Sequence, residues 1–339
     1  MPRAPEFWRA PPGWTARLLS PLGWLYGAAT ARRMRRAGAS VEAPVICVGN
    51  FTLGGAGKTP AVIALAAMLR GMGANPVVVS RGYGGSSAGP LRVDPATHDA
   101  ALVGDEPLEI AAHAAVIVAR DRVAGARAAI AAGADCVLLD DGMQNPSLEK
   151  NLTFAVIDGG ALFGNGFCAP AGPLRAPVAA QAGHVDALIL IGAATPPDGF
   201  GLSGKPFFAA RLFPDADVMH ALREANGVLA FAGIGRPEKF FDMLRDAGVS
   251  VAATKAFGDH QPYRDADLAA IAAAAAEKNL VPVTTMKDLS RIGAARAEAM
   301  FAGRLRPVPA SLVFDDAYGV RALMARALRG RKRAKKPEA

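Results

Sequence analysis

Cysteine and histidine are scarce in this chain, which has three of the first and five of the second among 339 residues. There is no Cys-x-x-Cys motif and no closely spaced pair of histidines, so the sequence lacks the ligand pattern that is typical of structural zinc sites. Cys47 and Cys136 lie within apolar, strand-like runs, and Cys168 is distant from both. This usage indicates reduced thiols and predicts a cytosolic protein.

Long hydrophobic runs are also missing. No apolar stretch reaches the roughly 18 residues that indicate a membrane-spanning helix. The apolar stretch near the N-terminus is interrupted by Pro11, Pro12, Gly13 and Pro21 and is followed by arginines, which disfavours a cleavable signal peptide. No Asn-Lys-x-Asp motif follows a later strand, so a guanine-nucleotide switch is disfavoured as well.

Acidic residues are few at both ends of the chain, and the formal net charge is +8. Such a charge favours anionic partners, which include nucleotides, lipid head groups and nucleic acid. We interpret the five basic residues after position 330 as part of a solvated tail. The first 40 residues combine seven arginines with all three tryptophans and several leucines, a composition that suits a bilayer interface. The alternative is a helix packed on its own domain.

The most informative motif is a glycine-rich turn that follows the apolar run at residues 45–48. Backbone N–H groups of such a turn can surround a polyphosphate, while a lysine reaches the outer phosphates and a hydroxyl holds Mg²⁺. Thr52 stands where the strict pattern has glycine, and an ordinary strand-to-helix turn is the alternative. The glycines followed by Lys-Thr favour nucleotide binding. The turn consists of Gly54, Gly55, Ala56, Gly57, Lys58, Thr59 and Pro60.

Two pairs of adjacent acidic residues are further candidates for a functional role. Asp140 and Asp141 come directly after an apolar strand candidate, at the sheet edge where ligands bind in open α/β folds, and are candidates to hold Mg²⁺. An Asp-Gly turn is the alternative. Asp105 and Glu106 precede a proline and a helical stretch, and by itself this pattern favours a helix cap at Asp105. Arg81 follows a further strand candidate, but this signal alone is weak.

The alternation of apolar runs with helical stretches predicts an α/β fold that resembles phosphate-loop NTPases, with a mainly parallel sheet flanked by helices. A segment rich in Pro, Gly and Asp at residues 195–205 precedes a second series of strands and helices. We therefore expect a membrane-interface segment over residues 1–40 and a phosphate-loop kinase domain over 41–222. These are followed by a smaller α/β domain over 223–330 and a basic tail over 331–339.

Taken together and in order, these motifs resemble the tetraacyldisaccharide 4'-kinases of lipid A biosynthesis, from the N-terminal segment to about Asp288. The segments that carry the resemblance are Val48-Gly49-Asn50 with the glycine-rich turn, Ser80-Arg81-Gly82-Tyr83, Gly104-Asp105-Glu106-Pro107, Asp140-Asp141-Gly142, Gly172-Pro173-Leu174-Arg175, Gly258-Asp259-His260 and Thr284-Thr285 with Lys287-Asp288.

The resemblance implies an ATP- and Mg²⁺-dependent transfer of the γ-phosphate to the 4'-hydroxyl of tetraacyldisaccharide 1-phosphate, which gives lipid IVA. The expected partners are this acylated disaccharide phosphate lipid and the inner-membrane surface, where the protein would be peripheral on the cytoplasmic face. No nucleic acid partner is expected.

The resemblance also implies roles for individual residues. Asp105 becomes the catalytic base, with His260 of the other domain as its support, and this replaces the helix-cap interpretation. Lys58 is catalytic, and Arg81 and Arg175 contact substrate or phosphate. The metal region is implied to contain Thr59, Glu106, Asp140 and Asp141.

The chain departs from the family pattern at one place, where Asn145 stands instead of the usual histidine. Asparagine can orient a group by hydrogen bonding but cannot carry a proton or a positive charge near neutral pH. Two other classes of function remain open from the residues alone. One is an ATPase that switches partner binding without a lipid acceptor, and the other, ranked last, is a nucleic-acid-binding protein.

Overall fold

The structure is a computed structural model that describes residues 5–193, 195, 201–259 and 261–332. The chain forms two compact units. The larger unit contains Pro5–His98, Leu102–Leu212 and the C-terminal segment from Leu312, and the smaller unit consists mainly of Phe213–Ser311.

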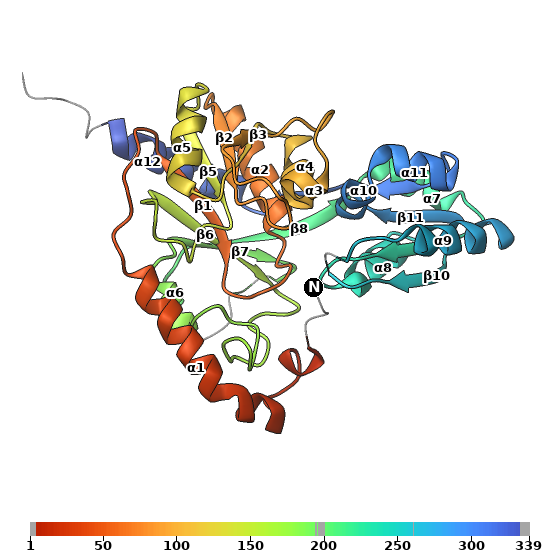
Figure 1. Cartoon of the computed structure of the whole chain (residues 1–339), viewed down its shortest axis with the longest axis horizontal. Helices are drawn as coiled ribbons and strands as arrows, with labels where there is room; N and C mark the ends of the chain where they lie inside the picture. Colours follow the sequence, from red (N-terminus) through yellow and green to blue (C-terminus); the bar gives the residue numbers. More distant parts are fainter. Residues whose placement is uncertain (1–4, 194, 196–200, 260, 333–339) are drawn as a thin grey trace, which may run out of the picture. The chain divides into compact units, whose positions relative to one another are not determined.

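The larger unit is built on a nine-stranded sheet with the strand order β13-β8-β7-β6-β1-β5-β2-β4-β3 (Figure 1). Neighbouring strands are parallel along the sheet from β4 through β2, β5, β1, β6 and β7 to β8, whereas β3 is antiparallel to β4. The strands are β1 (Val45–Asn50), β2 (Pro76–Ser80), β3 (Leu91–Arg92), β4 (Val116–Val118), β5 (Cys136–Asp140), β6 (Leu152–Asp158), β7 (Ala187–Ile191), β8 (Phe207–Pro214) and β13 (Ala310–Phe314).

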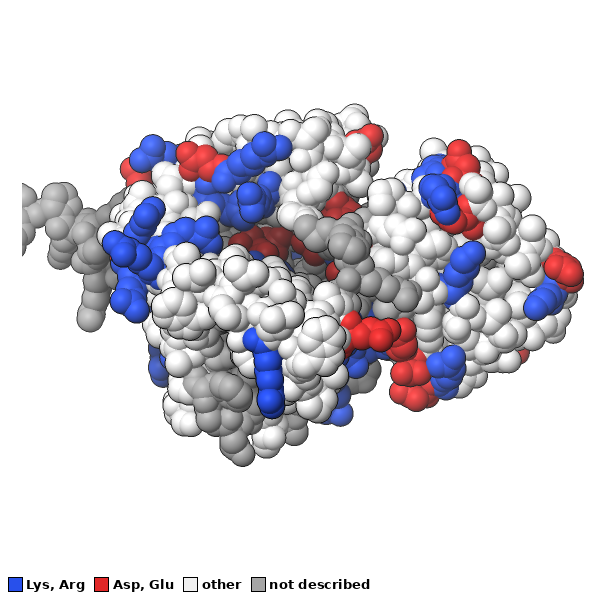
Figure 2. Space-filling view, turned by 60° about the horizontal axis from the view of Figure 1, so that its bottom comes forward, with Lys and Arg blue, Asp and Glu red and all other residues white. Residues whose placement is uncertain are grey.

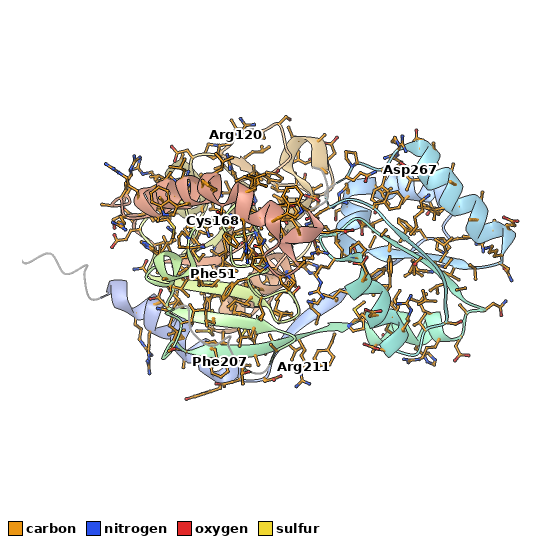
Figure 3. All side chains as sticks on the ribbon, turned by 90° about the horizontal axis from the view of Figure 1, so that it is seen from below. Phe51, Arg120, Cys168, Phe207, Arg211 and Asp267 are labelled. Carbon is orange, nitrogen blue, oxygen red and sulfur yellow. The ribbon has the colours of Figure 1, made fainter. Side chains whose placement is uncertain are left out.

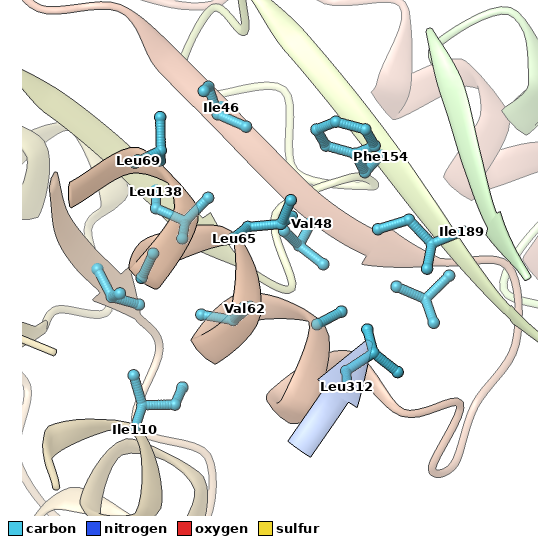
Figure 4. Packing of buried hydrophobic residues seen from close by; sticks show 14 of the residues in the cluster. Ile46, Val48, Val62, Leu65, Leu69, Ile110, Leu138, Phe154, Ile189 and Leu312 are labelled. Atoms are coloured by element: carbon cyan, nitrogen blue, oxygen red, sulfur yellow. The ribbon is translucent and has the colours of Figure 1, made fainter. Parts of the chain in front are cut away.

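Helices cover both faces of this sheet because its central strands are apolar on both sides. Ile46 and Val48 of β1 pack in one core with Leu65 and Leu69 of α2 (Figure 4), whereas Val45 and Cys47 of the same strand face a second core. The helical elements outside Phe213–Ser311 are η1 (Glu6–Trp8), α1 (Trp14–Met34), α2 (Lys58–Gly71), α3 (Ala100–Val103), α4 (Asp105–Ala111), α5 (Arg122–Ala131), α6 (Val178–Ala182) and α12 (Ala317–Lys332).

The smaller unit has its own four-stranded parallel sheet, with the order β10-β9-β11-β12. Phe231 of β9 is fully buried at its centre, and its ring contacts those of Phe257, Tyr263 and Phe301. The elements are α7 (Ala216–Arg223), β9 (Val228–Ala232), α8 (Pro237–Asp246), β10 (Val251–Ala256), α9 (Asp265–Glu277), β11 (Val281–Thr285), α10 (Met286–Ile292), α11 (Ala294–Phe301) and β12 (Arg306–Val308).

The predicted α/β class with a mainly parallel sheet is confirmed. The boundaries of the two compact units differ from those of the predicted domains. The chain leaves the larger unit along β8 and returns along β13, its neighbour in the same sheet. Arg211, labelled in Figure 3, lies in the second half of β8 and pairs with Asp315 at 3.1 Å. The C-terminal helix α12 then buries Val320 and Met324 in the core of the larger unit. The apolar face of α12 therefore places the end of the chain with the larger unit, not with the predicted domain over 223–330.

Candidate active site

The glycine-rich turn connects β1 to α2 and requires glycine at two places. Gly54 and Gly57 have φ angles of 98° and 87°, in the left-handed region that glycine adopts without strain. A Cβ atom at Gly57 would also lie 2.5 Å from the side chain of Ile191. The turn ends at the N-terminus of α2, whose first N–H groups have no partner within the helix and can bind phosphate.

Asn50, the last residue of β1, organises this turn. Its Nδ2 donates to the carbonyl oxygens of Thr52 and Gly54 at 2.8 and 3.4 Å, and its Oδ1 accepts from Nζ of Lys58 at 3.2 Å. The side chain of Lys58 is almost fully buried, and its Nζ lies 3.8 Å from Oδ2 of Asp141. The lysine is therefore held next to the turn and beside a carboxylate.

The two aspartates after β5 have opposite electrostatic environments. Burial raises the pKa of Asp140 to about 7, with further contributions from the negative charges of Glu106 and Asp141. Burial would also raise the pKa of Asp141, but Lys58 and then Arg175 outweigh it, and the pKa falls to about 2. The carboxyl group of Asp140 thus resists ionisation, whereas that of the next residue, Asp141, is stabilised in its ionised form.

Arg175 connects the turn to these aspartates. Its Nη2 donates to Oδ2 of Asp141 at 2.9 Å, and its Nε donates to the carbonyl of Thr52 at 3.0 Å. Its backbone N–H donates to the carbonyl of Phe51, also at 3.0 Å. Since one arginine holds both the backbone of the turn and Asp141, a phosphate bound in the turn would lie next to a guanidinium group.

Three polar residues without an expected role complete this arrangement. Ser80 donates to Oδ2 of Asp140 at 2.8 Å. Gln144 donates to the carbonyl of Asn50 and to Oε1 of Gln181, both at 2.8 Å, and Gln181 is fully buried. Ser80 belongs to a quoted motif and Gln144 follows one directly, but nothing local in the sequence distinguishes Gln181.

The segment that begins at Gly104 lies close to the loop after β2. Asp105 is the first residue of α4 and is buried, and the N-cap position belongs to Gly104, so the helix-cap interpretation of Asp105 is wrong. A Cβ atom at Gly104 would lie 2.6 Å from the carbonyl oxygen of Tyr83. Glu106 is near enough to Asp140 for its charge to raise the pKa of that residue.

The structure thus brings together, within the larger unit, the turn, Lys58, Asp140, Asp141, Glu106 and Arg175. Arg81 is exposed, directly after β2. His260 lies outside the described residues. Figure 2 shows acidic side chains recessed in a hollow of the larger unit, with lysine and arginine side chains near its rim.

Asn145 takes part in a local turn. Its Oδ1 accepts from the backbone N–H of Ser147 at 2.9 Å, and its backbone carbonyl accepts from Nζ of Lys150 at 2.6 Å. These bonds fix the position of the segment after Asp141 without a charged group at position 145.

Two oxygens of the aspartate pair fit a divalent cation. Oδ1 of Asp140 and Oδ1 of Asp141 are buried and have no hydrogen-bond partner. Among the described residues, no group of three or more His, Cys, Asp or Glu side chains could hold a metal ion by itself. Mg²⁺ commonly takes only one or two carboxylates and completes its shell with phosphate oxygens and water, so the two orphaned oxygens suit this ion when it arrives with a nucleotide.

Comparison with known proteins agrees with this geometry. A family model described as tetraacyldisaccharide-1-P 4'-kinase (LpxK) matches residues 15–329. The chain belongs to this kinase family. The tetraacyldisaccharide 4'-kinase of Methylobacterium sp. (strain 4-46) is 55% identical over 97% of this chain and 99% of its own length. The corresponding kinase of Bradyrhizobium sp. (strain ORS 278) is 49% identical over 96% and 98%.

A solved structure has the same fold. LpxK from Aquifex aeolicus, in a crystal structure titled as the "apo" form in complex with ATP, aligns with a TM-score of 0.73 and 26% identity, covering 92% of this chain and 99% of its own. The resemblance stated from the motifs is confirmed, and so are the fold class and the enzyme class, a phosphotransferase with an alcohol acceptor.

Proposed function

We propose that the chain transfers the γ-phosphate of ATP to the 4'-hydroxyl of a tetraacyldisaccharide 1-phosphate lipid. The observation that carries this proposal is the joint placement of Lys58, Asp141 and Arg175 around the glycine-rich turn. Phosphoryl transfer depends mainly on alignment of the reactants and on stabilisation of charge on the phosphate oxygens. The turn and α2 supply N–H donors, and Lys58 and Arg175 supply positive charge.

Mg²⁺ is part of this proposal. The Thr59 hydroxyl, Asp140 and Asp141 would hold the ion, with Glu106 close to Asp140. Bound there together with ATP, the ion would reduce the negative charge of the phosphate oxygens. It would also favour the ionised form of Asp140, whose burial and acidic neighbours oppose ionisation in the free protein.

The acceptor hydroxyl needs a base, and we assign this role to Asp105. An ordinary aspartate has a pKa of about 3.9 and is a weak base, but in a loose transition state the proton need leave only late. His260, in the predicted smaller domain, is assigned as its support, and Arg81 and Arg175 as contacts to the phosphate or substrate. The buried position of Asp105 at the start of α4 is compatible with this role.

A membrane-binding surface belongs to the same proposal. Trp14, Leu18, Leu22 and Leu25 recur at three- or four-residue spacing along α1, and each is more than half exposed. Contiguous exposed apolar surface of this kind is typical of an interaction site. None of the described helices is long and apolar enough to cross a membrane. We therefore propose peripheral binding of α1 at the cytoplasmic face of the inner membrane, where the acylated substrate would be found.

The other side of α1 packs on its own unit. A Cβ atom at Gly23 would lie 2.6 Å from the carbonyl oxygen of Cys168, and one at Gly27 would lie 2.7 Å from its Sγ. The helix therefore approaches the loop around Cys168 (Figure 3) through small residues. Contact with a membrane and packing on the larger unit are therefore compatible for this segment, because one face of α1 is packed and the opposite face is exposed.

Incubation of the purified protein with γ-labelled ATP, Mg²⁺ and the disaccharide lipid tests the proposal. We expect the label on the lipid, and we expect Lys58→Met to abolish the transfer. Release of labelled phosphate at an equal rate with and without the lipid, and no labelled lipid, would instead indicate the ATPase alternative.

A further inference from the structure

Two buried amide groups in series lie next to the glycine-rich turn of the larger unit. Gln181 of α6 is fully buried, and Gln144 is 6% exposed. Nε2 of Gln181 donates to the carbonyl oxygens of Phe51 and Ala176, at 3.3 and 2.5 Å. Its Oε1 accepts from Nε2 of Gln144 at 2.8 Å, and Oε1 of Gln144 accepts from Nη1 of Arg175 at 3.4 Å. The two amides therefore connect backbone carbonyls to a guanidinium group of the site.

The backbone carbonyls decide which way each amide points. A carbonyl oxygen is only an acceptor, so the two that face Gln181 require its NH₂ group and leave its oxygen for Gln144. Gln144 must then present its own NH₂ group, whose second N–H donates to the carbonyl of Asn50 at 2.8 Å. Because both donors of Gln144 are occupied, its oxygen is the group that faces Arg175. This orientation suits a guanidinium, which has donors and no acceptor.

An amide at position 181 needs an explanation other than packing. Val178 and Ala182 of the same helix belong to an apolar core, which an apolar side chain at 181 would extend. A buried amide must instead recover within the protein the hydrogen bonds that it made with water. Both the NH₂ group and the oxygen of Gln181 have partners. What the amide adds, and an apolar residue could not, is a fixed orientation of Gln144.

Gln181 also bonds to the backbone around Arg175. Ala176 directly follows Arg175, and the carbonyl of Phe51 accepts from the backbone N–H of Arg175 at 3.0 Å as well as from Gln181. The side chain of Arg175 is 19% exposed, so hydrogen bonds have to hold what packing leaves free. One buried side chain is thus bonded to the segment of Arg175, to the start of the turn and, through Gln144, to the guanidinium.

We propose that Gln181 is a positioning residue for the phosphoryl transfer. It holds the guanidinium of Arg175 and the start of the glycine-rich turn in one arrangement, so that they do not have to be ordered at each turnover. The inference rests on the proposed function, in which Arg175 contacts the phosphate or substrate. Loss of orientation at a reacting group lowers the rate of the chemical step even when binding is unchanged.

Gln181→Met is the most direct test, because it keeps the unbranched shape of the side chain and removes the amide. We expect kcat to fall about tenfold and KM for ATP to stay within about twofold, since Lys58 and the N–H donors of the turn remain. Gln144→Leu is the second variant and removes the acceptor that faces Arg175, so kcat should fall by at least about threefold. If Gln181→Met does not fold, a normal kcat of Gln144→Leu would by itself overturn the inference.

Asn151→Ala is the matched control in the same unit. Oδ1 of Asn151 accepts from the backbone N–H of Val45 at 2.8 Å, at the end of β1 that is remote from the glycine-rich turn. Both Asn151→Ala and Gln181→Met lose side-chain hydrogen bonds to the backbone, so both should lower the melting temperature. Only Gln181→Met should lower kcat, measured well below both melting temperatures. An equal fall in kcat in both variants would show that general destabilisation is the cause, and the inference would be wrong.

A double-mutant cycle with Arg175→Ala identifies the route of the effect. If Gln181 acts through Arg175, then Gln181→Met should lower kcat less than about twofold in the Arg175→Ala background, where labelled ATP keeps low rates measurable. An equal loss in both backgrounds would overturn the inference. Failure of the proposed function gives a different result, because the wild-type protein would then transfer no label to the lipid. An active wild-type protein with a fully active Gln181→Met variant contradicts the positioning role alone.

Discussion

Replacing Asp140 by asparagine should stabilise the free protein at alkaline pH although it removes a residue assigned to the metal. The pKa of Asp140 is raised to about 7 in the folded protein from an ordinary 3.8. Each pKa unit corresponds to about 1.4 kcal/mol, so ionisation of Asp140 at pH 8 opposes folding by ~4 kcal/mol when no cation is present. The amide keeps an acceptor for the Ser80 hydroxyl and carries no charge.

The pH dependence follows from the direction of this shift. Between pH 4 and pH 7 the unfolded chain has released the proton of Asp140 and the folded chain retains it, so the free energy of unfolding falls as the pH rises. Below about pH 4 both states are protonated, and Asp140→Asn should change little. The advantage of the variant should grow by about 2–3 kcal/mol between pH 5 and pH 8 and remain constant above that.

Thermal unfolding followed by circular dichroism, with a chelator and without nucleotide, measures this difference. For a unit of this size, 1 kcal/mol corresponds to about 2–4 °C, so the gain in melting temperature should increase by ~5–10 °C between the two pH values. Addition of Mg²⁺ and ATP should reduce the gain, because a bound cation favours the ionised wild-type side chain.

Asp141→Asn is the matched control, with the opposite expectation. The pKa of Asp141 is lowered to about 2, chiefly by Lys58 and Arg175 acting against burial, so its ionised form stabilises the fold. This stability is fully present above about pH 4 and is lost as the pH falls towards 2. The variant should therefore lose ~2 kcal/mol at both pH 5 and pH 8. Destabilisation of Asp140→Asn at pH 8, or a gain that does not change with pH, would refute the reasoning.

Three further predictions concern the site and α1. Asp105→Ala and His260→Ala should each lower kcat by at least about 100-fold with a modest change in ATP affinity, and near-normal turnover in either would contradict the assignment of the pair. Gly57→Ala should abolish nucleotide binding measured by calorimetry, since its φ is left-handed and Ile191 occupies the space of the added methyl group. Leu18→Ser combined with Leu22→Ser should reduce sedimentation with anionic vesicles at an unchanged melting temperature. Tyr318→Ser, at an exposed apolar residue of α12, is the control and should leave sedimentation unchanged. Equal vesicle binding by the wild type, the double variant and the control would exclude α1 as the membrane contact.

The parts of the site that the sequence predicted are those with local signals. The glycine-rich turn and the aspartate pair each follow an apolar strand, and parallel strands bring such segments to one edge. Arg175 was assigned only through the resemblance to the kinase family, because its distance in sequence from Asp141 hides their contact. Gln181 was missed for a similar reason, since its partner Gln144 comes from a different segment and no motif lies near Gln181.

The fold was predictable to a similar extent. Apolar runs and helical stretches indicate element type and the α/β class, because both depend on periodicity within a few residues. The unit on which α12 packs cannot be predicted from the residues of the helix alone. Its apolar face would suit either unit, and only the packing of Val320 and Met324 in the core that also contains Leu65 decides between them.

The path of the chain through β8 and β13 affects the order in which the protein can be completed during synthesis. These strands are neighbours in one sheet, but about 100 residues, which form most of the smaller unit, separate them along the chain. The ribosome therefore delivers β13 and α12 after the inserted unit is already whole. Until then β8 is an open edge strand, and the α2 face that later packs beneath α12 is uncovered. A nascent chain that stops before residue 310 should depend on chaperones, although it contains every residue assigned to the chemistry.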